Sequence, residues 1–393
     1  MMKMKMTKIT WVTRSFLDYR IPVYAALNRL CDNHLTLIYY KDVVPEKVRN
    51  KIKAILGNRA IELTGEYRIG GKKKDNAGMA NKTLRIPIQP GLIKAIIESQ
   101  PDVMISDGFF QWTYAPLYIR ATKKIPHVMC YERTMHTERN AGLIRTTYRK
   151  LALHWIDTID CSGSLCGKYI RSLGFDKNKI TFGHMTADTT ELMHKIASIT
   201  AQETQALRKK LTNNQLIYLY VGQIIPRKGI IEMLSAWKEA GLKDASLILI
   251  GNGSQQQEIS RFIHEKQIPN VTLEGRIDYE KISMFYQAAD CFIIPTLEDN
   301  WSLVVPEAMS CGLPVLCSEY NGCWPELVQE KNGWIFNPLK KSSIIDALMN
   351  SYKNKAKFKE MGQQSIEIIS HHTPEIAANG IWEACQMSIK KTD

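Results

Sequence analysis

Short apolar runs recur along the chain and are separated by segments of helix length. They are clearest in the second half, where they lie at residues 216–221, 246–250, 271–274, 291–294, 314–317 and 333–336. Continuous apolar runs of this length are typical of strands that are buried on both faces of a parallel sheet. The pattern therefore predicts a doubly wound sheet of six parallel strands with helices between them.

The first half shows the same alternation less regularly. Its strand-like runs lie at residues 8–13, 35–40, 102–106, 126–131, 156–161 and 179–183, and helical patterns occur at 21–30, 91–99, 113–123, 141–154 and 162–174. Because 393 residues suffice for two full cores, we expect an α/β protein of two doubly wound, Rossmann-like domains. We place the first domain at residues 1–188 and the second at 189–374.

Composition narrows the class of protein. A hydrophobic content of 45% is ordinary for a soluble globular protein, no run reaches the roughly eighteen apolar residues of a membrane span, and no signal peptide is visible. The nine cysteines include no Cys-x-x-Cys pair, and Cys311, Cys317 and Cys323 have no histidine nearby to complete a metal site. We therefore expect reduced thiols in a cytoplasmic protein, and no metal site.

Charge is distributed unevenly between the two halves. Residues 1–150 hold 27 Lys and Arg against 12 Asp and Glu, whereas the remainder holds 25 against 27. A basic helix and a Gly- and Lys-rich loop, within residues 41–85, contribute to this excess and could equally be a solvated helix face and a flexible loop. The first half is expected to meet an anionic partner, either a lipid-diphosphate acceptor or an anionic membrane surface at the inner face of the membrane. No nucleic-acid-binding motif is present, so nucleic acid is not an expected partner.

The stretch from Pro295 to Pro314 carries the strongest chemical signal. It follows a buried strand with a polar turn and then a helix that is expected to begin near Ser302, as N-cap, and to end at Gly312. The free amides and positive dipole of a helix N-terminus suit an anion such as phosphate. Asp299 and Glu307 lie eight residues apart and can border the same crevice; the alternative is a solvated acidic loop that caps a helix.

A second signal follows the strand at 216–221. Arg227 and Lys228 lie at or just before the start of the next helix, where the dipole disfavours cations unless an anion neutralises them. A nucleotide diphosphate would do so, and the alternative is an exposed basic turn. Asn252 and Gly253 follow the next strand, where glycine lets the backbone approach a ligand.

The spacing of Asp299 and Glu307, followed by Ala-Met-x-Cys-Gly-x-Pro-Val, resembles the Glu-x7-Glu signature of family-4 retaining glycosyltransferases of the GT-B fold, of the bacterial polysaccharide-assembly type. Asp299 stands where the family usually has Glu, and residues 300–303 (Asn-Trp-Ser-Leu) stand where it often has Gly-Phe-Gly-Leu. Glu298 is the rival first carboxylate, but its spacing to Glu307 is one residue too long. The resemblance implies two Rossmann-like domains that face each other across a cleft, with a last helix, about 375–393, that packs back on the first domain.

The resemblance also implies a metal-independent, retaining transfer of a sugar from a nucleotide sugar to a glycan or lipid-linked saccharide, with no resident cofactor. Arg227 and Lys228 would hold the diphosphate, Asp299 the hydroxyls of the transferred sugar, and Glu307 the ribose. The departing phosphate would take the acceptor's proton. The donor-binding set implied in this way is Gly222, Asn252, Gly253, Arg276, Ile277, Asn300, Trp301, Ser302 and Leu303.

Two loops of the first domain are expected to serve the acceptor side. Asp18, Tyr19 and Arg20 follow the first strand, and this loop lacks the Gly-Gly turn that the resembled family often has; a tight turn packed by aromatic residues is the alternative. Glu132 follows the strand at 126–131 and precedes His136. In the resembled family a first-domain histidine commonly contacts the donor sugar, so His136 is the candidate, and a surface histidine is the alternative.

Two other classes of function remain open at this level. Sugar-nucleotide epimerases share the fold but do not generally pair Arg-Lys with a carboxylate-x7-Glu motif. A non-catalytic nucleotide-sugar or glycan-binding protein would also fit Asp299 and the missing Gly-Gly turn. An epimerase would act without an acceptor, and a binding protein would bind the donor without hydrolysis or transfer.

Overall fold

The computed structural model describes residues 6–70, 85–183, 185–213 and 215–390. The expected Gly- and Lys-rich loop around Lys72 lies outside these residues. The chain divides into two compact units. It passes from the first unit to the second near Thr186 and returns to the first near His371. Among the described residues, the first unit includes those before Ala187 and the C-terminal segment from His372, and the second unit includes Ala187–His371.

The first unit is built on a parallel sheet in the order β3-β2-β1-β6-β7-β8-β9. Its strands are β1 (Ile9–Thr13), β2 (Leu35–Tyr40), β3 (Ala60–Leu63), β6 (Val103–Asp107), β7 (His127–Tyr131), β8 (Thr158–Cys161) and β9 (Ile180–Phe182). β3 was not predicted; it is an edge strand within the irregular segment 41–85. A separate antiparallel hairpin pairs β4 (Tyr67–Gly70) with β5 (Arg85–Ile88).

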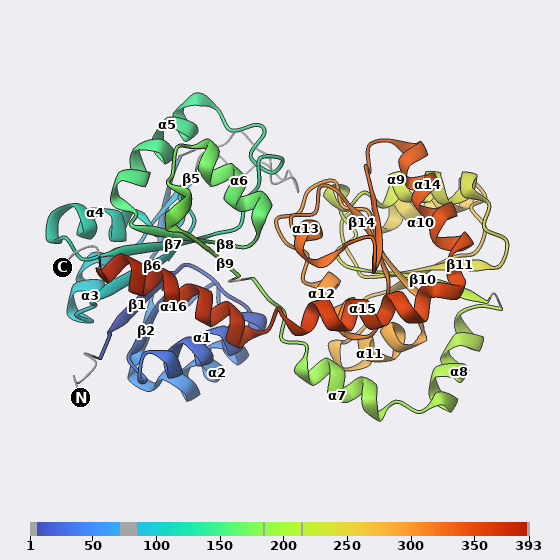
Figure 1. Ribbon diagram of the computed structural model, residues 1–393, viewed down its shortest axis with the longest axis horizontal. Helices are drawn as coiled ribbons and strands as arrows, with labels where there is room; N and C mark the ends of the chain where they lie inside the picture. Colours follow the sequence, from blue (N-terminus) through green and yellow to red (C-terminus); the bar gives the residue numbers. More distant parts are fainter. Residues whose placement is uncertain (1–5, 71–84, 184, 214, 391–393) are drawn as a thin grey trace. The chain divides into compact units, whose positions relative to one another are not determined.

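Helices cover both faces of this sheet (Figure 1). One face carries α1 (Ile21–Leu30), α2 (Glu46–Leu56) and α16 (Pro374–Lys390), which share one buried core. The other face carries α3 (Leu92–Glu98), α4 (Tyr114–Lys123), α5 (Leu143–Ala152) and α6 (Ser164–Ser172). Alternation of buried strands with helices on both faces is the doubly wound arrangement that the pattern of apolar runs predicts.

The last helix, α16, is an integral part of the first unit. Ala377, Ile381 and Cys385 are fully buried in the core that it shares with α1. The Thr158 hydroxyl of β8 donates a hydrogen bond of 2.9 Å to the Ala384 carbonyl oxygen. The chain therefore completes its first unit with its last helix.

The second unit is built on a parallel sheet in the order β12-β11-β10-β13-β14-β15. Its strands are β10 (Leu216–Val221), β11 (Ala245–Ile250), β12 (Val271–Gly275), β13 (Cys291–Ile294), β14 (Val315–Ser318) and β15 (Gly333–Phe336). β10, β13 and β15 have the predicted bounds. Counted within the unit, the order is 3-2-1-4-5-6, so the direction of strand addition reverses between β10 and β13.

The helices of the second unit surround this sheet. They are α7 (Thr190–Ser198), α8 (Ala201–Leu211), α9 (Ile230–Ala240), α10 (Gln256–Glu265), α11 (Tyr279–Ala288), α12 (Val304–Ser310), α13 (Trp324–Leu327), α14 (Lys341–Lys353) and α15 (Phe358–Ser370). Short 3-10 turns lie at Asp18–Arg20, Gly57–Arg59, Leu153–Trp155, Lys177–Lys179, Pro226–Lys228 and Lys355–Lys357. Within the described parts of the chain, no helix combines the length and the apolar content needed to cross a bilayer.

Candidate functional site

The candidate site lies at the switch point of the second sheet, between β10 and β13. Loop A (residues 222–229) follows β10, and loop B (residues 295–303) follows β13. Ligands of doubly wound sheets bind outside the carboxyl ends of the strands at such a point. Arg227 and Lys228 lie in loop A and Asp299 lies in loop B, so the fold brings the two predicted signals to one place.

Loops A and B are joined through the backbone of Arg227. Its carbonyl oxygen accepts hydrogen bonds from the Leu297 amide at 2.8 Å and from the Thr296 hydroxyl at 3.0 Å. Gly229 permits this close approach, because its φ is +66° and a Cβ there would lie 2.2 Å from the Pro295 carbonyl oxygen. A glycine is therefore required where the 3-10 turn meets α9.

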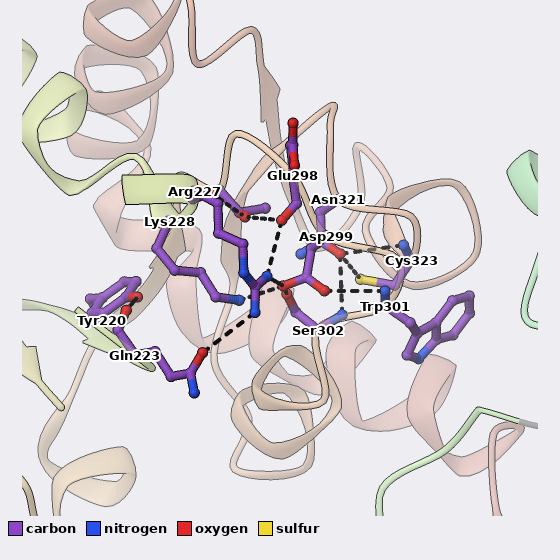
Figure 2. A network of polar contacts seen from close by, with 11 residues as sticks. Tyr220, Gln223, Arg227, Lys228, Glu298, Asp299, Trp301, Ser302, Asn321 and Cys323 are labelled. Carbon is purple, nitrogen blue, oxygen red and sulfur yellow. Dashed lines mark hydrogen bonds and ion pairs between the residues drawn. The ribbon is translucent and has the colours of Figure 1, made fainter. Parts of the chain in front are cut away.

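A buried ion pair forms the centre of the site (Figure 2). The Lys228 ammonium donates to Oδ2 of Asp299, which also accepts a 2.6 Å hydrogen bond from the Ser302 hydroxyl. The Arg227 guanidinium lies 3.8 Å from the same oxygen. Burial by itself would raise the pKa of Asp299, but the charge and hydrogen bond of Lys228, with Ser302 and Arg227, hold that pKa below its usual value.

The amides of loop B are partly occupied, which differs from the expectation. The Trp301 amide donates to Oδ1 of Asp299 at 3.3 Å, and the Ser302 amide donates to Oδ1 of Asn321 at 3.3 Å. Asn321 is fully buried. Two of the amides expected to face a ligand, those of Trp301 and Ser302, thus hold the loop in shape instead. The buried indole N–H of Trp301 makes no hydrogen bond to the described residues.

The helix after loop B begins later than predicted. α12 starts at Val304 with Leu303 as N-cap, and Ser302 is not the cap because its hydroxyl binds Asp299 instead. The helix is only seven residues long. Gly312 follows it with φ +74°, as expected for a residue that ends a helix.

Glu307 lies in the first turn of α12 and forms no ion pair with any cation of the described residues. Its Oε2 accepts a hydrogen bond of 2.9 Å from the hydroxyl of Tyr286 on α11. Burial raises the pKa of Glu307 to about 7, against the lowering effect of the Tyr286 hydrogen bond. Glu307 is therefore a carboxyl group that changes its charge near neutral pH.

The glycines around loop A permit close packing within the protein, and the predicted contact of Gly253 with a donor stays a prediction. A Cβ on Gly253 would lie 2.2 Å from the Ile224 carbonyl oxygen, and a Cβ on Gly222 would lie 2.9 Å from the Tyr220 hydroxyl. The Ile224 amide donates to the Asn252 carbonyl oxygen at 2.8 Å. Asn252 and Gly253 thus fix the shape of loop A.

The remaining predicted donor residues lie at different depths. Arg276 is exposed and Ile277 is half-buried after β12, an edge strand that is separated from β10 by β11. Asn300 is buried between Asp299 and Trp301 in loop B. Glu298 is also buried, and Figure 2 shows its side chain directed away from the Lys228–Asp299 pair.

In the first unit, the predicted loop after β1 lies at the switch point between β1 and β6. Asp18 is exposed and lies 3.2 Å from the Lys51 ammonium. Arg20 is buried, and its guanidinium lies 3.4 Å from Oδ1 of Asp107 at the end of β6. Burial raises the pKa of Tyr19, which is half-exposed beside Arg20. Of the three acceptor residues predicted in this loop, Arg20 is thus buried in an ion pair.

A second carboxylate, Glu66, connects the loops at this switch point. Arg14 follows β1 and forms two 2.7 Å hydrogen bonds to Glu66, one to each carboxylate oxygen. The Trp112 indole, which follows β6, donates to Glu66 at 2.9 Å. Burial would raise the pKa of Glu66, but Arg14 and Trp112, with Arg68, hold it below its usual value.

The loop after β7, which holds the predicted donor-sugar residue His136, is organised by Glu138. Glu138 is buried and meets the guanidinium groups of Arg133 at 3.1 Å, Arg145 at 3.5 Å and Arg149 at 2.6 Å. Glu132 and His136 are both half-exposed in the same loop. The His136 carbonyl oxygen accepts a 2.7 Å hydrogen bond from Arg139.

Several of these residues were not singled out from the sequence. Asp107 is the polar residue that ends a predicted strand, which is a usable signal for a site residue. Arg145 and Arg149 are four apart on a helix, a spacing that places them on one face. Tyr286 lies within a helix in an ordinary amphipathic pattern and gives no such signal.

Residues 202–367, within the second unit, match the family Glycosyl transferases group 1. The second unit is a group 1 glycosyltransferase domain. The chain is 26% identical over 270 residues to a sulfoquinovosyl transferase of Arabidopsis thaliana, a match that covers 65% of the chain and 50% of that relative. It is 30% identical over 145 residues to an O-antigen chain mannosyltransferase of Escherichia coli, covering 35% and 36% respectively. The chain thus spans half or less of the length of these two relatives.

Among solved structures, the chain resembles HepE of Anabaena in complex with UDP. The TM-score is 0.72 at 13% sequence identity, and the match covers 96% of this chain and 99% of HepE. At this identity the likeness shows the fold. The group 1 domain and the doubly wound first unit are the two Rossmann-like parts of a GT-B fold, as the sequence predicted.

Proposed function

We propose that this chain is a retaining glycosyltransferase that moves a sugar from a nucleotide sugar to a hydroxyl of a glycan or lipid-linked saccharide. The observation that carries the proposal is the charge at the switch point of the group 1 domain. There Arg227 and Lys228 face the single carboxylate of Asp299. One positive charge is left over from this set, at the edge of the sheet where doubly wound folds bind nucleotides.

A diphosphate is the anion that best fits this excess charge. Asp299 fixes the Lys228 ammonium in one position. The Arg227 guanidinium lies near the same Asp299 oxygen, Oδ2, and the Arg227 side chain is 17% exposed. A guanidinium offers a fork for two phosphate oxygens, and an ammonium acts as a point charge. We therefore give Asp299 a positioning role for Lys228, because its oxygens are already engaged, in place of the contact with sugar hydroxyls that the resemblance implied.

The two cations would act during the reaction as well as in binding. The bond between the sugar's anomeric carbon and the diphosphate oxygen breaks, and a bond forms from that carbon to the acceptor oxygen. Negative charge grows on the diphosphate as it leaves, and fixed cations stabilise it. The acceptor hydroxyl gives its proton to the departing phosphate, so that no protein base and no protein nucleophile is required. We propose that the transfer needs no metal ion.

Glu307 and Trp301 would supply the remaining donor contacts. When it is ionised, the Glu307 carboxylate can accept hydrogen bonds from two ribose hydroxyls. The Trp301 indole N–H is a buried donor without a partner in the described structure, and a polar ligand group would satisfy it. Arg276 and Ile277 are proposed to meet the nucleotide base, and Asn300 the sugar.

The first unit would supply the acceptor side. Its loops after β1 and β7 hold the predicted acceptor residues, and His136 stays the candidate for a contact with the donor sugar. The E. coli relative named above is an O-antigen chain mannosyltransferase, which supports a saccharide acceptor in surface polysaccharide biosynthesis. Such an enzyme would work in the cytoplasm at the inner face of the membrane.

Arg227→Ala and Lys228→Ala test the diphosphate assignment directly. Each is expected to lower kcat about a hundredfold or more, because a single charge-stabilising group is removed from the transition state. Lys238→Ala, on the exposed face of α9, is the matched control and should leave kcat unchanged. Normal turnover in both site variants would overturn the proposal.

The donor and the stereochemistry need separate measurements. A thermal-shift panel of nucleotide sugars identifies the donor, since the ligand that binds the folded state raises the midpoint. Nuclear magnetic resonance of the product then reports whether the anomeric configuration is retained, and an inverted product would contradict the proposed stereochemistry. Turnover in a chelator tests independence of metal, and conversion of the donor without acceptor would indicate an epimerase instead.

A further inference from the structure

α5 in the first unit has its polar and apolar sides exchanged relative to an ordinary surface helix. Its buried residues are Arg145, Arg149 and Ala152. By contrast, Leu143 is 87% exposed and Ile144 is 78% exposed. A surface helix normally turns its apolar residues to the core and its charged residues to water.

The exposed apolar side chains lie on one side of this segment, which we call the α5 face. It consists of Leu143, Ile144 and Leu151 on the helix and Trp155 in the 3-10 turn that follows, the last two being 55% and 42% exposed. At 100° per residue, Leu151 falls between Leu143 and Ile144 around the helix axis. The three helix side chains thus form one strip along α5, and the exposed Thr147 lies between Leu143 and Leu151 in it.

The orientation of α5 is fixed from its inner side. The Arg149 guanidinium lies 2.6 Å from Glu138 and donates to the Tyr169 hydroxyl at 2.8 Å. Arg145 and Arg149 also lie 5.3 and 5.2 Å from the centre of the Phe110 ring. Rotating α5 to bury its leucines would expose these groups and leave the Glu138 carboxylate buried without its partners, which is costly.

Cations border the α5 face. Lys150 is exposed and lies seven residues after Leu143, so it projects from the same side of the helix, and Arg139 is exposed in the loop that leads into α5. A strip of leucine, isoleucine and tryptophan with basic residues beside it matches a surface that is apolar inside and anionic at its boundary. We propose that the α5 face docks this chain on the surface of an anionic lipid bilayer.

α2, the basic helix expected from the sequence to rest on lipid headgroups, lacks these features. Its apolar residues Val48, Ile52 and Leu56 are buried in the core of the first unit. Two of its lysines are paired, Lys51 with Asp18 at 3.2 Å and Lys53 with Glu62 at 2.9 Å. α2 therefore offers no exposed apolar group to insert, whereas α5 and the turn that follows it offer four.

A second copy of the chain is a less suitable occupant of the α5 face. A standard interface buries roughly 800 Å² on each partner, and a strip of four side chains on one helix and the turn after it is too narrow to supply this area. Leu143 and Ile144 are also adjacent at one end of the helix, where they form a small projecting group rather than a flat patch. Such a group suits insertion between lipids.

Sedimentation with vesicles tests the proposal on the full chain. The vesicles contain phosphatidylcholine alone or with phosphatidylglycerol, and no nucleotide sugar is present, so the result is independent of the proposed transfer activity. The wild-type chain should bind the anionic vesicles preferentially. The double variant Leu143→Ser with Ile144→Ser should lower the bound fraction about tenfold, and Lys150→Glu should lower it several-fold on anionic vesicles.

Leu339→Ser is the matched control, because Leu339 is a 64% exposed leucine in the second unit. This variant should bind as the wild type does, and circular dichroism should show all variants folded, since the replaced side chains are exposed. Equal binding of the double variant and the wild type would overturn the proposal, as would equal binding to both kinds of vesicle. A wild-type dimer that the double variant loses, seen by light scattering without lipid, would assign the α5 face to self-association instead.

Discussion

The two units carry the same device at the same topological point, with different chemistry around it. In each unit, a cation follows the first strand of the sheet, β1 or β10. A carboxylate ends or follows the fourth strand in chain order, β6 or β13. Arg20 meets Asp107 in the first unit, and Lys228 meets Asp299 in the second. In both places the ion pair fixes the loop that leaves the first strand.

The surroundings of the two pairs differ in charge and in access. In the first unit, the Arg20 guanidinium lies 5.5 Å from the centre of the Trp11 ring, and the Trp11 indole donates to Asp107 at 3.3 Å. In the second unit a further cation, Arg227, lies beside the pair. The difference indicates that the ion pair at each switch point has a structural role, and that the residues around it determine what can bind there. The second unit adds positive charge, and the first adds aromatic surface.

Among the variants that test this difference, Asp299→Asn should have the largest effect on the free energy of unfolding. It leaves Lys228 buried without its carboxylate, and breaking a buried pair costs about 3–5 kcal/mol of unfolding free energy. If a diphosphate binds here, a nucleoside diphosphate replaces the lost negative charge. It should therefore raise the thermal midpoint of the variant more than that of the wild type.

Asp107→Asn is the sister variant in the first unit. It should also destabilise the protein, but a nucleoside diphosphate should shift its midpoint no more than it shifts the wild type. An equal extra shift in both variants would show that the two switch points do not differ in the way described. Denaturant unfolding and thermal shift with a panel of nucleoside diphosphates supply both measurements.

The pH dependence of stability should differ in sign between Glu307 and Glu66. The pKa of Glu307 is raised from 4.5 to about 7, so the unfolded chain loses this proton first as pH rises. The stability from Glu307 is complete below a pH of about 4.5 and is lost as pH rises to about 7, a loss on the order of 3 kcal/mol. Glu307→Gln should remove this loss, which denaturant unfolding at pH 4 and pH 8 would show.

The opposite holds for Glu66, whose pKa is lowered by Arg14, Trp112 and Arg68 against the raising effect of burial. Its stabilisation is present above the ordinary pKa of a glutamate and disappears as the solution is acidified. Glu66→Gln should therefore destabilise the protein at pH 8 more than at pH 4. The same sign for both glutamine variants would contradict the environments seen for these two carboxyl groups.

Gly229→Ala should have a smaller effect that separates steric contact from backbone strain. Gly229 and Gly241 both have positive φ, +66° and +57°, so alanine strains the backbone at either position by about 1 kcal/mol. Only at Gly229 does the new Cβ also meet a backbone atom at short range, the Pro295 carbonyl oxygen at 2.2 Å. Gly229→Ala should be the more destabilising by at least about 1 kcal/mol, and equal losses would show that loops A and B separate without cost.

Much of the fold follows from the sequence because buried parallel strands leave a direct trace. β10, β13 and β15 were predicted with their bounds, since each is a continuous apolar run between polar turns. α7 and α8 were not predicted. α8 buries none of its residues and so has no apolar face to recognise. The capping box of Thr200 and Glu203 was a signal that could have located α8.

The candidate site was predictable in its parts but not in its pairings. Arg227, Lys228 and Asp299 were found from local patterns, each relative to its own strand or helix. Lys228 and Asp299 are 71 residues apart, and nothing local indicates that one neutralises the other. The Ser302 hydroxyl was likewise predicted to accept a backbone N–H as a helix cap, whereas in the structure it donates to Asp299, three residues before it.

The place of α16 has a consequence for how the chain is made. On the ribosome, the described strands of the first unit emerge before Ala187–His371 of the second unit, yet Ala377 and Ile381 emerge only after them. Until then, the side chains that α16 covers are open to water and to chaperones. A nascent chain must therefore keep its first unit unfinished while the second, which is continuous in sequence, folds to completion.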